Sequence, residues 1–152
     1  MRAIGFLSRR EYSRQELRVK LLAAARKRES DAQVQTAAAD PDNEVDSLLD
    51  WLEAHGYLSD TRFVESRVHA RTARQGTTAI RQELARHGVS LPPEQAAALR
   101  ETEFARAQAV WQRKFGAVAA EARGRAAQAR FLAARGFAAD VVRRIVGGED
   151  EF

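Results

Sequence analysis

Residues 76–88 read GTTAIRQELARHG, and residues 124–136 read GRAAQARFLAARG. Each stretch begins and ends with glycine and carries a leucine four residues before its second glycine, and the two stretches lie 48 residues apart. Phe63 and Trp111 are separated by the same distance. A fixed period of this length is typical of repeat proteins, in which neighbouring units share one hydrophobic core. The sequence therefore predicts tandem copies of one small unit.

Helical preference extends over nearly the whole chain. Only three prolines and nine glycines occur among 152 residues, and alanine, arginine, leucine, glutamine and glutamate favour helices. Ser13 and Glu16 have the spacing of a capping box at the start of one helix. Val45, Leu48 and Leu52 recur with the spacing of one apolar helix face. The predicted fold class is all-α, an elongated array of three tandem three-helix repeats.

The period also sets the expected limits of the repeats. They are repeat 1 at residues 1–56, repeat 2 at 57–100, repeat 3 at 101–148 and an acidic tail at 149–152. Pro41 and a mixture of acidic and small residues predict a loop near residues 29–43 within the first repeat. Pro92 and Pro93 suit the first turn of a short helix that ends near Arg100, and a longer helix is expected after it.

Composition excludes several classes of protein. Hydrophobic residues make up 45% and charged residues 30% of the chain, which is too apolar for a disordered segment and too interrupted for a membrane span. The N-terminus lacks a signal-like apolar run, so a cytoplasmic protein is expected. The chain has no cysteine, no glycine-rich phosphate loop and no histidines at metal-ligand spacing. We therefore expect no enzyme, no cofactor and no metal site.

Charge is unevenly distributed along the chain, whose formal net charge is +4. Residues 1–28 hold nine Lys/Arg and two acids, whereas residues 29–60 hold nine acids and no Lys/Arg. Arg67, Arg71 and Arg74 recur at helical spacing and form one predicted basic stripe. Such stripes attract phosphate backbones or acidic protein surfaces, and ordinary solubilising charge is the alternative reading.

Arginine supplies 22 of the 25 basic residues. This excess favours bidentate contacts with phosphates or carboxylates. High-GC codon usage would produce the same excess, so both origins stay open.

Five stretches, in chain order, resemble the signatures of the RecX regulatory proteins. They are FLSRREYSRQELRVKLL at 6–22, LEAHGYLSDTRFVESRVHAR at 52–71, GTTAIRQELARHGV at 76–89, VWQRKFG at 110–116 and RFLAARGF at 130–137. The resemblance covers nearly the whole chain. It implies an all-helical regulator built from three three-helix repeats, in agreement with the period of 48 residues.

The resemblance also implies a partner, the RecA recombinase assembled as a filament on single-stranded DNA. Members of the family lie in the helical groove of that filament and suppress ATP hydrolysis, strand exchange and the stimulated self-cleavage of the SOS repressor. A regulator of homologous recombination, DNA repair and the SOS response is therefore expected, and a mostly polar exterior favours a monomer. Two alternatives remain open: a helical protein that binds DNA directly without RecA, and a scaffold for some other protein.

Most apolar and glycine positions in the five motifs have a structural explanation as core residues or helix ends, so the basic positions are the candidates for partner binding. These candidates are Arg9, Arg10, Arg14, Arg62, Arg67, Arg71, Arg74, Arg113, Lys114, Arg130 and Arg135. The competing role for them is pairing with nearby acids such as Glu16, Asp60 and Glu83. No catalytic residue is expected.

Overall fold

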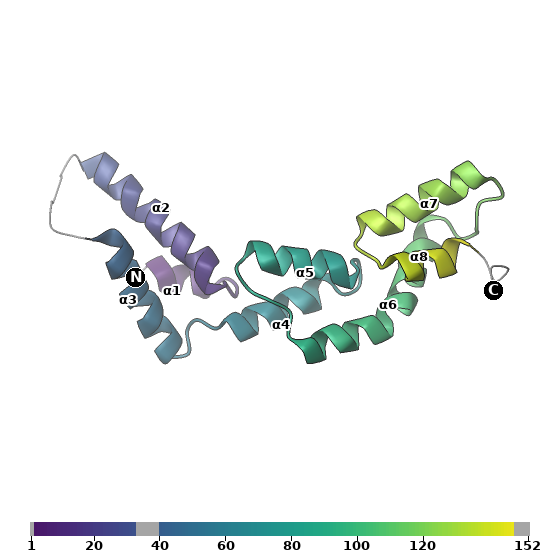
Figure 1. Cartoon of the computed structure of the whole chain (residues 1–152). Coiled ribbons are helices and arrows are strands. Elements are labelled where there is room, and N and C mark those ends of the chain that lie inside the picture. The colour runs from purple at the N-terminus through teal and green to yellow at the C-terminus, as the bar shows by residue number, and fades with distance from the viewer. Residues whose placement is uncertain (1, 33–39, 148–152) are drawn as a thin grey trace. The chain divides into compact units, whose positions relative to one another are not determined.

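The computed structural model describes residues 2–32 and 40–147 (Figure 1). Within these ranges the chain forms eight helices and no strand, which confirms the predicted all-α class. The predicted acidic tail at 149–152 and the central part of the predicted loop, residues 33–39, lie outside the described residues.

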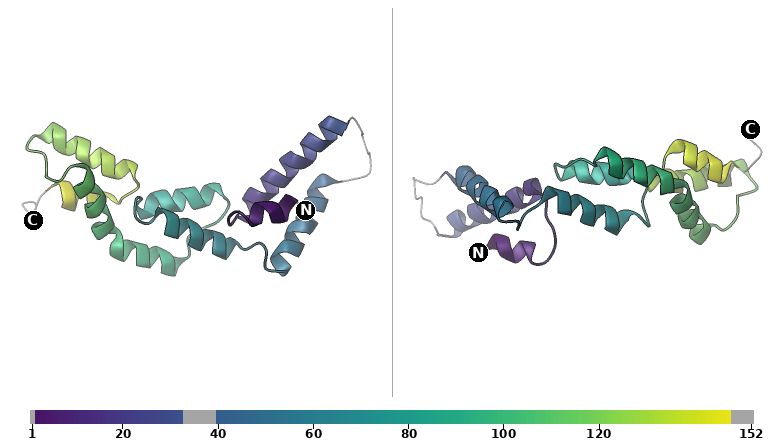
Figure 2. Two further views of the ribbon diagram at one scale, coloured as in Figure 1. Left: turned by 180° about the vertical axis from the view of Figure 1, so that it is seen from behind. Right: turned by 90° about the horizontal axis from the view of Figure 1, so that it is seen from below.

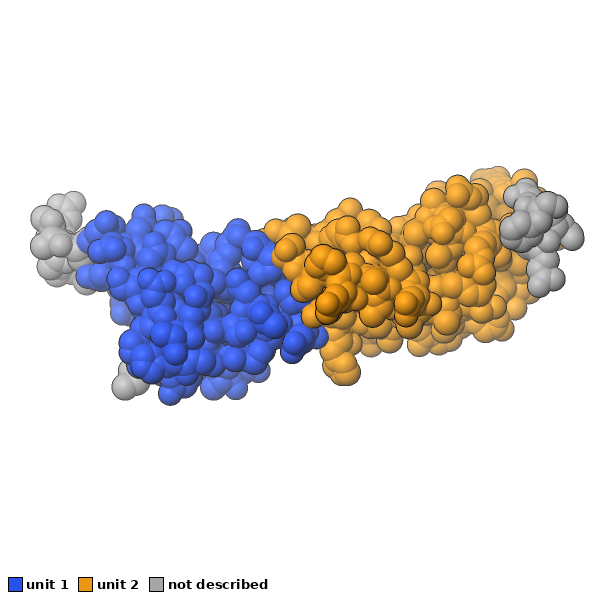
Figure 3. Space-filling model, turned by 60° about the horizontal axis from the view of Figure 1, so that its bottom comes forward, with its two compact units in different colours: residues 1–66, 87–89 blue, residues 67–86, 90–152 orange. Residues whose placement is uncertain are grey.

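The chain divides into two compact units (Figure 3). The N-terminal unit consists of residues 1–66 and 87–89, and the C-terminal unit consists of residues 67–86 and 90–152. The predicted limits of the three repeats do not coincide with this division, and they stay a prediction.

The N-terminal unit contains three helices and the first part of a fourth. They are α1 (Arg2–Leu7), α2 (Arg14–Ala32), α3 (Pro41–Ala54) and the beginning of α4 (Asp60–Arg71). Helices α2 and α3 lie side by side (Figures 1 and 2). Leu17 of α2 and Leu49 and Leu52 of α3 are fully buried between them. Leu48, which was expected on the same apolar face as Leu52, instead remains 38% exposed.

The predicted loop is shorter than residues 29–43. Helix α2 continues to Ala32 because no proline or glycine interrupts it. Helix α3 already starts at Pro41, with Asp40 as its N-cap. The Asp40 carboxylate accepts a hydrogen bond from the N–H of Asn43 at 3.4 Å, and proline is favoured at the first helical position. The proline therefore begins a helix here.

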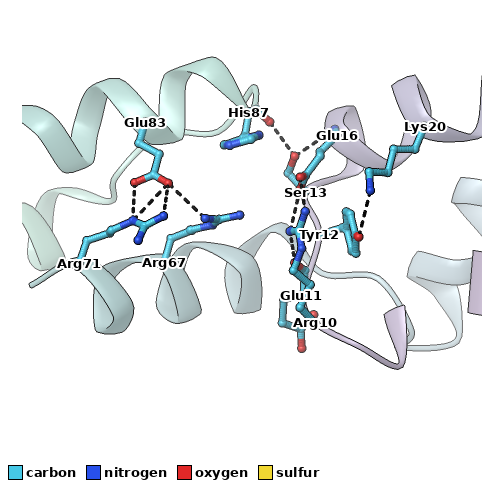
Figure 4. Close-up of polar contacts among 10 residues, drawn as sticks. All are labelled: Arg10, Glu11, Tyr12, Ser13, Glu16, Lys20, Arg67, Arg71, Glu83 and His87. Atoms are coloured by element: carbon cyan, nitrogen blue, oxygen red, sulfur yellow. Dashed lines mark hydrogen bonds and ion pairs between the residues drawn. The ribbon is translucent and has the colours of Figure 1, made fainter. Parts of the chain in front are cut away.

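Ser13 joins the start of α2 to the segment at residues 87–89 of the same unit. Its buried hydroxyl accepts from the N–H of Glu16 at 3.1 Å and donates to the carbonyl of His87 at 2.8 Å (Figure 4). The predicted cap is thus confirmed. The Glu16 carboxylate also pairs with Arg10.

The C-terminal unit contains the end of α4 and four further helices. They are α5 (Thr77–Arg86), α6 (Pro93–Lys114), α7 (Ala122–Ala134) and α8 (Ala139–Val146). Helices α7 and α8 pack on each other and on α6, as Figure 2 shows. Trp111, Leu132 and Ile145 belong to the core that these three helices share.

The expectation of a break near Arg100 is wrong. Helix α6 is one helix of 22 residues. No proline or glycine occurs between Pro93 and Gly116, and a single face of the helix is buried from Ala96 to Trp111. Continuous burial on one face stabilises an uninterrupted helix, so the expected limit between repeats 2 and 3 falls inside α6.

The glycines of the two repeated stretches have different roles. Gly88 and Gly136 adopt positive φ angles of 73° and 83°, the left-handed conformation expected after a helix. Gly76 is instead a packing residue. Its N–H donates to the carbonyl of Arg135 at 2.8 Å, and a Cβ at this position would overlap the carbonyl of Gly136. The end of α7 therefore packs directly against the start of α5.

Arg106 of α6 forms hydrogen bonds with the turn that follows α4. Its partly buried guanidinium donates to the carbonyls of Thr72 at 3.0 Å, Gln75 at 2.6 Å and Leu99 at 2.9 Å. Desolvation by this burial lowers the pKa of Arg106, although an arginine stays charged at all relevant pH values. The side chain thus joins α6 to two carbonyls of the turn that follows α4.

Replacing Arg106 with methionine will destabilise the C-terminal unit. Methionine keeps most of the side-chain volume but removes every donor to the three carbonyls, so we expect a loss of about 2–4 kcal/mol in the free energy of unfolding. Urea unfolding followed by circular dichroism measures this loss. Arg100→Met, at an exposed position on the same helix, is the control. Equal stability of the two variants would contradict the assignment.

Candidate partner-binding surface

Five of the eleven predicted contact residues take part in ion pairs within the chain. Arg10 pairs with Glu16, Arg14 with Asp50 and Glu53, Arg62 with Glu11, and both Arg67 and Arg71 pair with Glu83. These arginines connect helices or helix ends of one unit. A partner that binds them has to compete with a carboxylate that is already in place.

The predicted stripe of Arg67, Arg71 and Arg74 is only partly open. Figure 4 shows the Glu83 carboxylate of α5 facing two arginines of α4. Arg71 Nε donates to it at 3.0 Å and an Arg67 amino group at 3.2 Å. The hydrogen bonds to Glu83 raise the pKa of Arg71. The first two arginines therefore brace α4 against α5, and Arg74 remains exposed.

Helices α2 and α3 are joined by a second set of ion pairs. Arg14 reaches Asp50 at 2.8 Å and Glu53 at 3.0 Å, and Arg18 Nε donates to Asp46 at 2.8 Å. The three acids recur along one side of α3, and the two arginines lie one turn apart on α2. The spacing of these acids and arginines is visible in the sequence, but Arg18 was not among the predicted contact residues.

The pair of Arg18 and Asp46 predicts a small dependence of stability on pH. The hydrogen bond from Arg18 lowers the pKa of Asp46 below its ordinary value of 3.8. A lowered folded-state pKa stabilises the protein above the unfolded pKa, and this contribution is lost as the pH falls through the folded value. Asp46→Asn will therefore lower Tm slightly at pH 7, and the difference from wild type will shrink below about pH 4. A difference that grows in acid would contradict this assignment.

The other six predicted contact residues are exposed and form no ion pair with another described residue. They are Arg9, Arg74, Arg113, Lys114, Arg130 and Arg135. Four of them lie at the end of α6, in α7 or directly after α7. Of the eleven predicted contact residues, those that are exposed and form no ion pair therefore lie mainly in the C-terminal unit.

Lys114 and Arg135 lie against one aromatic ring. The Arg135 guanidinium carbon is 4.8 Å and the Lys114 Nζ is 5.7 Å from the centre of the Phe131 ring. The Phe115 ring meets Phe131 edge-on, with 5.3 Å between the ring centres. Both distances to the cations are within cation–π range. We call these four residues the Phe131 cluster.

Helix ends contribute to the Phe131 cluster. Lys114 is the last residue of α6 and Arg135 is the C-cap of α7. The negative ends of the two helix dipoles stabilise these cations. Because the ring and the dipoles partly order the side chains, less entropy is lost when an anion binds. The cluster is suited to phosphate oxygens or to carboxylates on a protein.

A groove of about 610 Å³ lies elsewhere in the C-terminal unit, between α5, α6 and α8. Arg81 and Arg100 line it together with Glu103 and Asp140. The buried Glu103 carboxylate accepts from the N–H of Thr77 at 2.7 Å and so caps α5. The groove therefore carries both signs of charge, and one of its acids has a structural role.

Among the described residues, no group of three or more His, Asp or Glu side chains is placed to hold a metal ion. None of the helices in the described ranges is long and apolar enough to span a membrane.

Two family models match the chain, with the descriptions "RecX, second three-helix domain" at residues 59–91 and "RecX, third three-helix domain" at residues 101–146. Similarity to curated relatives extends over almost the full length. A regulatory protein RecX from Ralstonia pickettii (strain 12J) is 47% identical over 152 residues, which is 99% of this chain and 87% of the relative. The chain belongs to the RecX family.

Other RecX proteins show the same extent of similarity. The regulatory protein RecX of Ralstonia nicotianae is 47% identical over 98% of this chain and 86% of its own length. That of Leptothrix cholodnii is 43% identical over 95% of this chain and 85% of its own length. The resemblance noted in the five motifs is confirmed, and the relatives are named as regulatory proteins.

Proposed function

We propose that this chain regulates the RecA recombinase by binding the RecA filament on single-stranded DNA and inhibiting its ATPase, recombinase and coprotease activities. The observation that carries the proposal is the near full-length similarity to proteins named regulatory protein RecX. The filament assembles in the cytoplasm, so the protein acts there, in recombination, DNA repair and the SOS response.

The exposed cations support an anionic binding partner. Arg113, Lys114, Arg130 and Arg135 are exposed and form no ion pair with a described residue, so they are available to phosphates of the filament DNA or to acidic side chains of RecA. Contacts from two compact units add up because the second contact becomes intramolecular once the first has formed. A chain bound in this way hinders the subunit motions coupled to ATP turnover without taking part in the chemistry.

The same cations favour a second candidate function, direct binding to DNA without RecA. Binding of this kind depends steeply on salt because each neutralised phosphate releases counterions. It requires no contact with a RecA subunit. The two functions therefore differ in whether RecA increases the affinity for the DNA.

Cosedimentation with RecA filaments on single-stranded DNA separates the two functions. We expect the chain to pellet with filaments at concentrations at which naked single-stranded DNA of equal length binds little of it. Equal affinity for filament and naked DNA, with a steep salt dependence in both cases, would favour the DNA-binding alternative and contradict the proposal.

A further inference from the structure

Three aromatic rings lie together on the surface of the N-terminal unit. Trp51 is 45% and Tyr57 47% exposed. The Trp51 ring is stacked on His55 with 4.2 Å between the ring centres and an interplanar angle of 23°, and on Tyr57 with 5.7 Å and 11°. Leu48, one turn before Trp51, is also exposed. We call these four residues the Trp51 patch.

The patch lies outside the buried face of α3. Val45, Leu49 and Leu52 occupy the buried face of the same helix. The His55 ring nitrogen Nδ1 lies 2.8 Å from the carbonyl of Trp51. The positive φ of 77° at Gly56 turns the chain directly before Tyr57. Clustered exposed aromatic side chains mark interaction sites, because tryptophan and tyrosine dominate the binding energy of interfaces.

The charge around the patch indicates the chemistry of the occupant. Helix α3 carries five acids and no lysine or arginine. Arg14 and Arg18 neutralise those that face α2, but Glu44, one turn before Leu48, is exposed and has no ion pair with a described residue. A phosphate backbone is repelled by this helix. An arginine or lysine is attracted, and it can lie on the faces of the aromatic rings.

We propose that the Trp51 patch docks a basic and apolar surface of a RecA subunit and does not contact the DNA. The inference rests on the proposed function for the identity of the partner. The Trp51 patch would be a second contact with the filament, and the charge around it is opposite to that of the Phe131 cluster. The N-terminal unit would then bind a basic surface through this patch, and the C-terminal unit would bind an anionic one through the cluster. The first step of binding brings acidic α3 to a basic protein surface, and the aromatic rings are then covered.

Single substitutions at exposed positions test this inference. Trp51→Ala and Tyr57→Ala remove rings without opening the core, and Glu44→Lys reverses the nearby charge. Val19→Ala is the matched control, because Val19 is 62% exposed on α2 of the same unit. Circular dichroism and thermal unfolding establish that each variant is folded. Cosedimentation then measures binding to RecA filaments and, separately, to naked single-stranded DNA.

We expect Trp51→Ala and Tyr57→Ala each to weaken filament binding at least about tenfold and Glu44→Lys to weaken it as well. Binding of Trp51→Ala and Tyr57→Ala to naked DNA stays within about twofold of wild type because their charge is unchanged, Glu44→Lys does not weaken it, and Val19→Ala behaves as wild type in both assays. If the loss of a ring lowers the stability of the N-terminal unit, Glu44→Lys still tests the inference, because it changes an exposed charge and removes no ring.

The other possible outcomes overturn the inference, and they show whether the proposed function fails with it and whether the patch binds something else. If wild type binds filaments and Trp51→Ala, Tyr57→Ala and Glu44→Lys bind them equally well, the inference is overturned and the proposed function stands. Absence of wild-type binding to filaments overturns both. A parallel loss of naked-DNA binding in Trp51→Ala assigns the patch to nucleobases. A dimer of wild type that Trp51→Ala dissociates, with filament binding unchanged, assigns it to a second copy of this chain.

Discussion

Gly136→Ala will destabilise the C-terminal unit by about 3 kcal/mol or more. The left-handed conformation at φ 83° costs an alanine roughly 1–2 kcal/mol. The added Cβ would in addition overlap both the backbone and the side chain of Ala79 at the start of α5, and overpacking of this kind costs about 1–3 kcal/mol. Because backbone atoms cannot rotate away, the two helices have to separate.

Substitutions at two other glycines separate the conformational cost of Gly136→Ala from its packing cost. Gly116 has a φ of 77° and only ordinary contacts around the position of a Cβ, so Gly116→Ala will lose only the conformational part. A Cβ at Gly76 would overlap the carbonyl of Gly136, and Gly76 does not adopt a left-handed φ, so Gly76→Ala reports the packing part. Equal losses in Gly136→Ala and Gly116→Ala would contradict the close approach of α7 to α5.

Urea unfolding followed by the fluorescence of Trp111 makes this comparison within one unit. Trp111 is buried in the C-terminal core, whereas Trp51 belongs to the N-terminal unit. A Trp51→Phe background therefore restricts the signal to the unit that carries all three glycines. The free energy of unfolding is compared under conditions in which this signal changes in one step.

Reversing the charge of both cations in the Phe131 cluster will have the largest effect on function. In Lys114→Glu/Arg135→Glu, attraction to an anionic partner is replaced by repulsion at two exposed positions, and the cation–π contacts with Phe131 are lost. We expect binding to RecA filaments to weaken at least about thirtyfold. The concentration needed for half-maximal inhibition of the RecA ATPase will rise in proportion.

A charge-matched double variant is the control for this prediction. Arg86→Glu/Arg123→Glu changes the net charge by the same amount, at exposed positions of α5 and α7 outside the cluster. It will keep binding within a few-fold of wild type. If both double variants lose binding equally, the partner responds to the overall charge of the unit and the Phe131 cluster is not a specific contact.

Local rules explain why much of the fold was predictable from sequence. The hydrogen bond from the N–H of Glu16 to Ser13 and the left-handed φ angles of Gly88 and Gly136 at helix ends follow from residues close in sequence. Leu84 and Leu132, the matched leucines of the repeated stretches, are both fully buried. A period in the sequence predicts equivalent environments because each copy repeats the same local structure.

Contacts between distant segments were not predictable in the same way. The sequence identified Arg67 and Arg71 as basic and evenly spaced, but only the packing of α4 on α5 brings Glu83 between them. Likewise, glycine at position 76 is explained by the carbonyl of Gly136, 60 residues away. Exposure of Trp51 follows from its position outside the buried face of α3. The spacing of Trp51 from the apolar residues of this helix is visible in the sequence, but Trp51 was not among the predicted contact residues.

The rate of ATP hydrolysis by RecA on single-stranded DNA, measured as this chain is titrated in, tests the central claim most directly. We predict a dose-dependent fall in the rate that approaches its limit near stoichiometric concentration. Lys114→Glu/Arg135→Glu will shift the curve to higher concentration, and Arg86→Glu/Arg123→Glu will not. An unchanged rate with chain that circular dichroism shows to be folded would contradict the account.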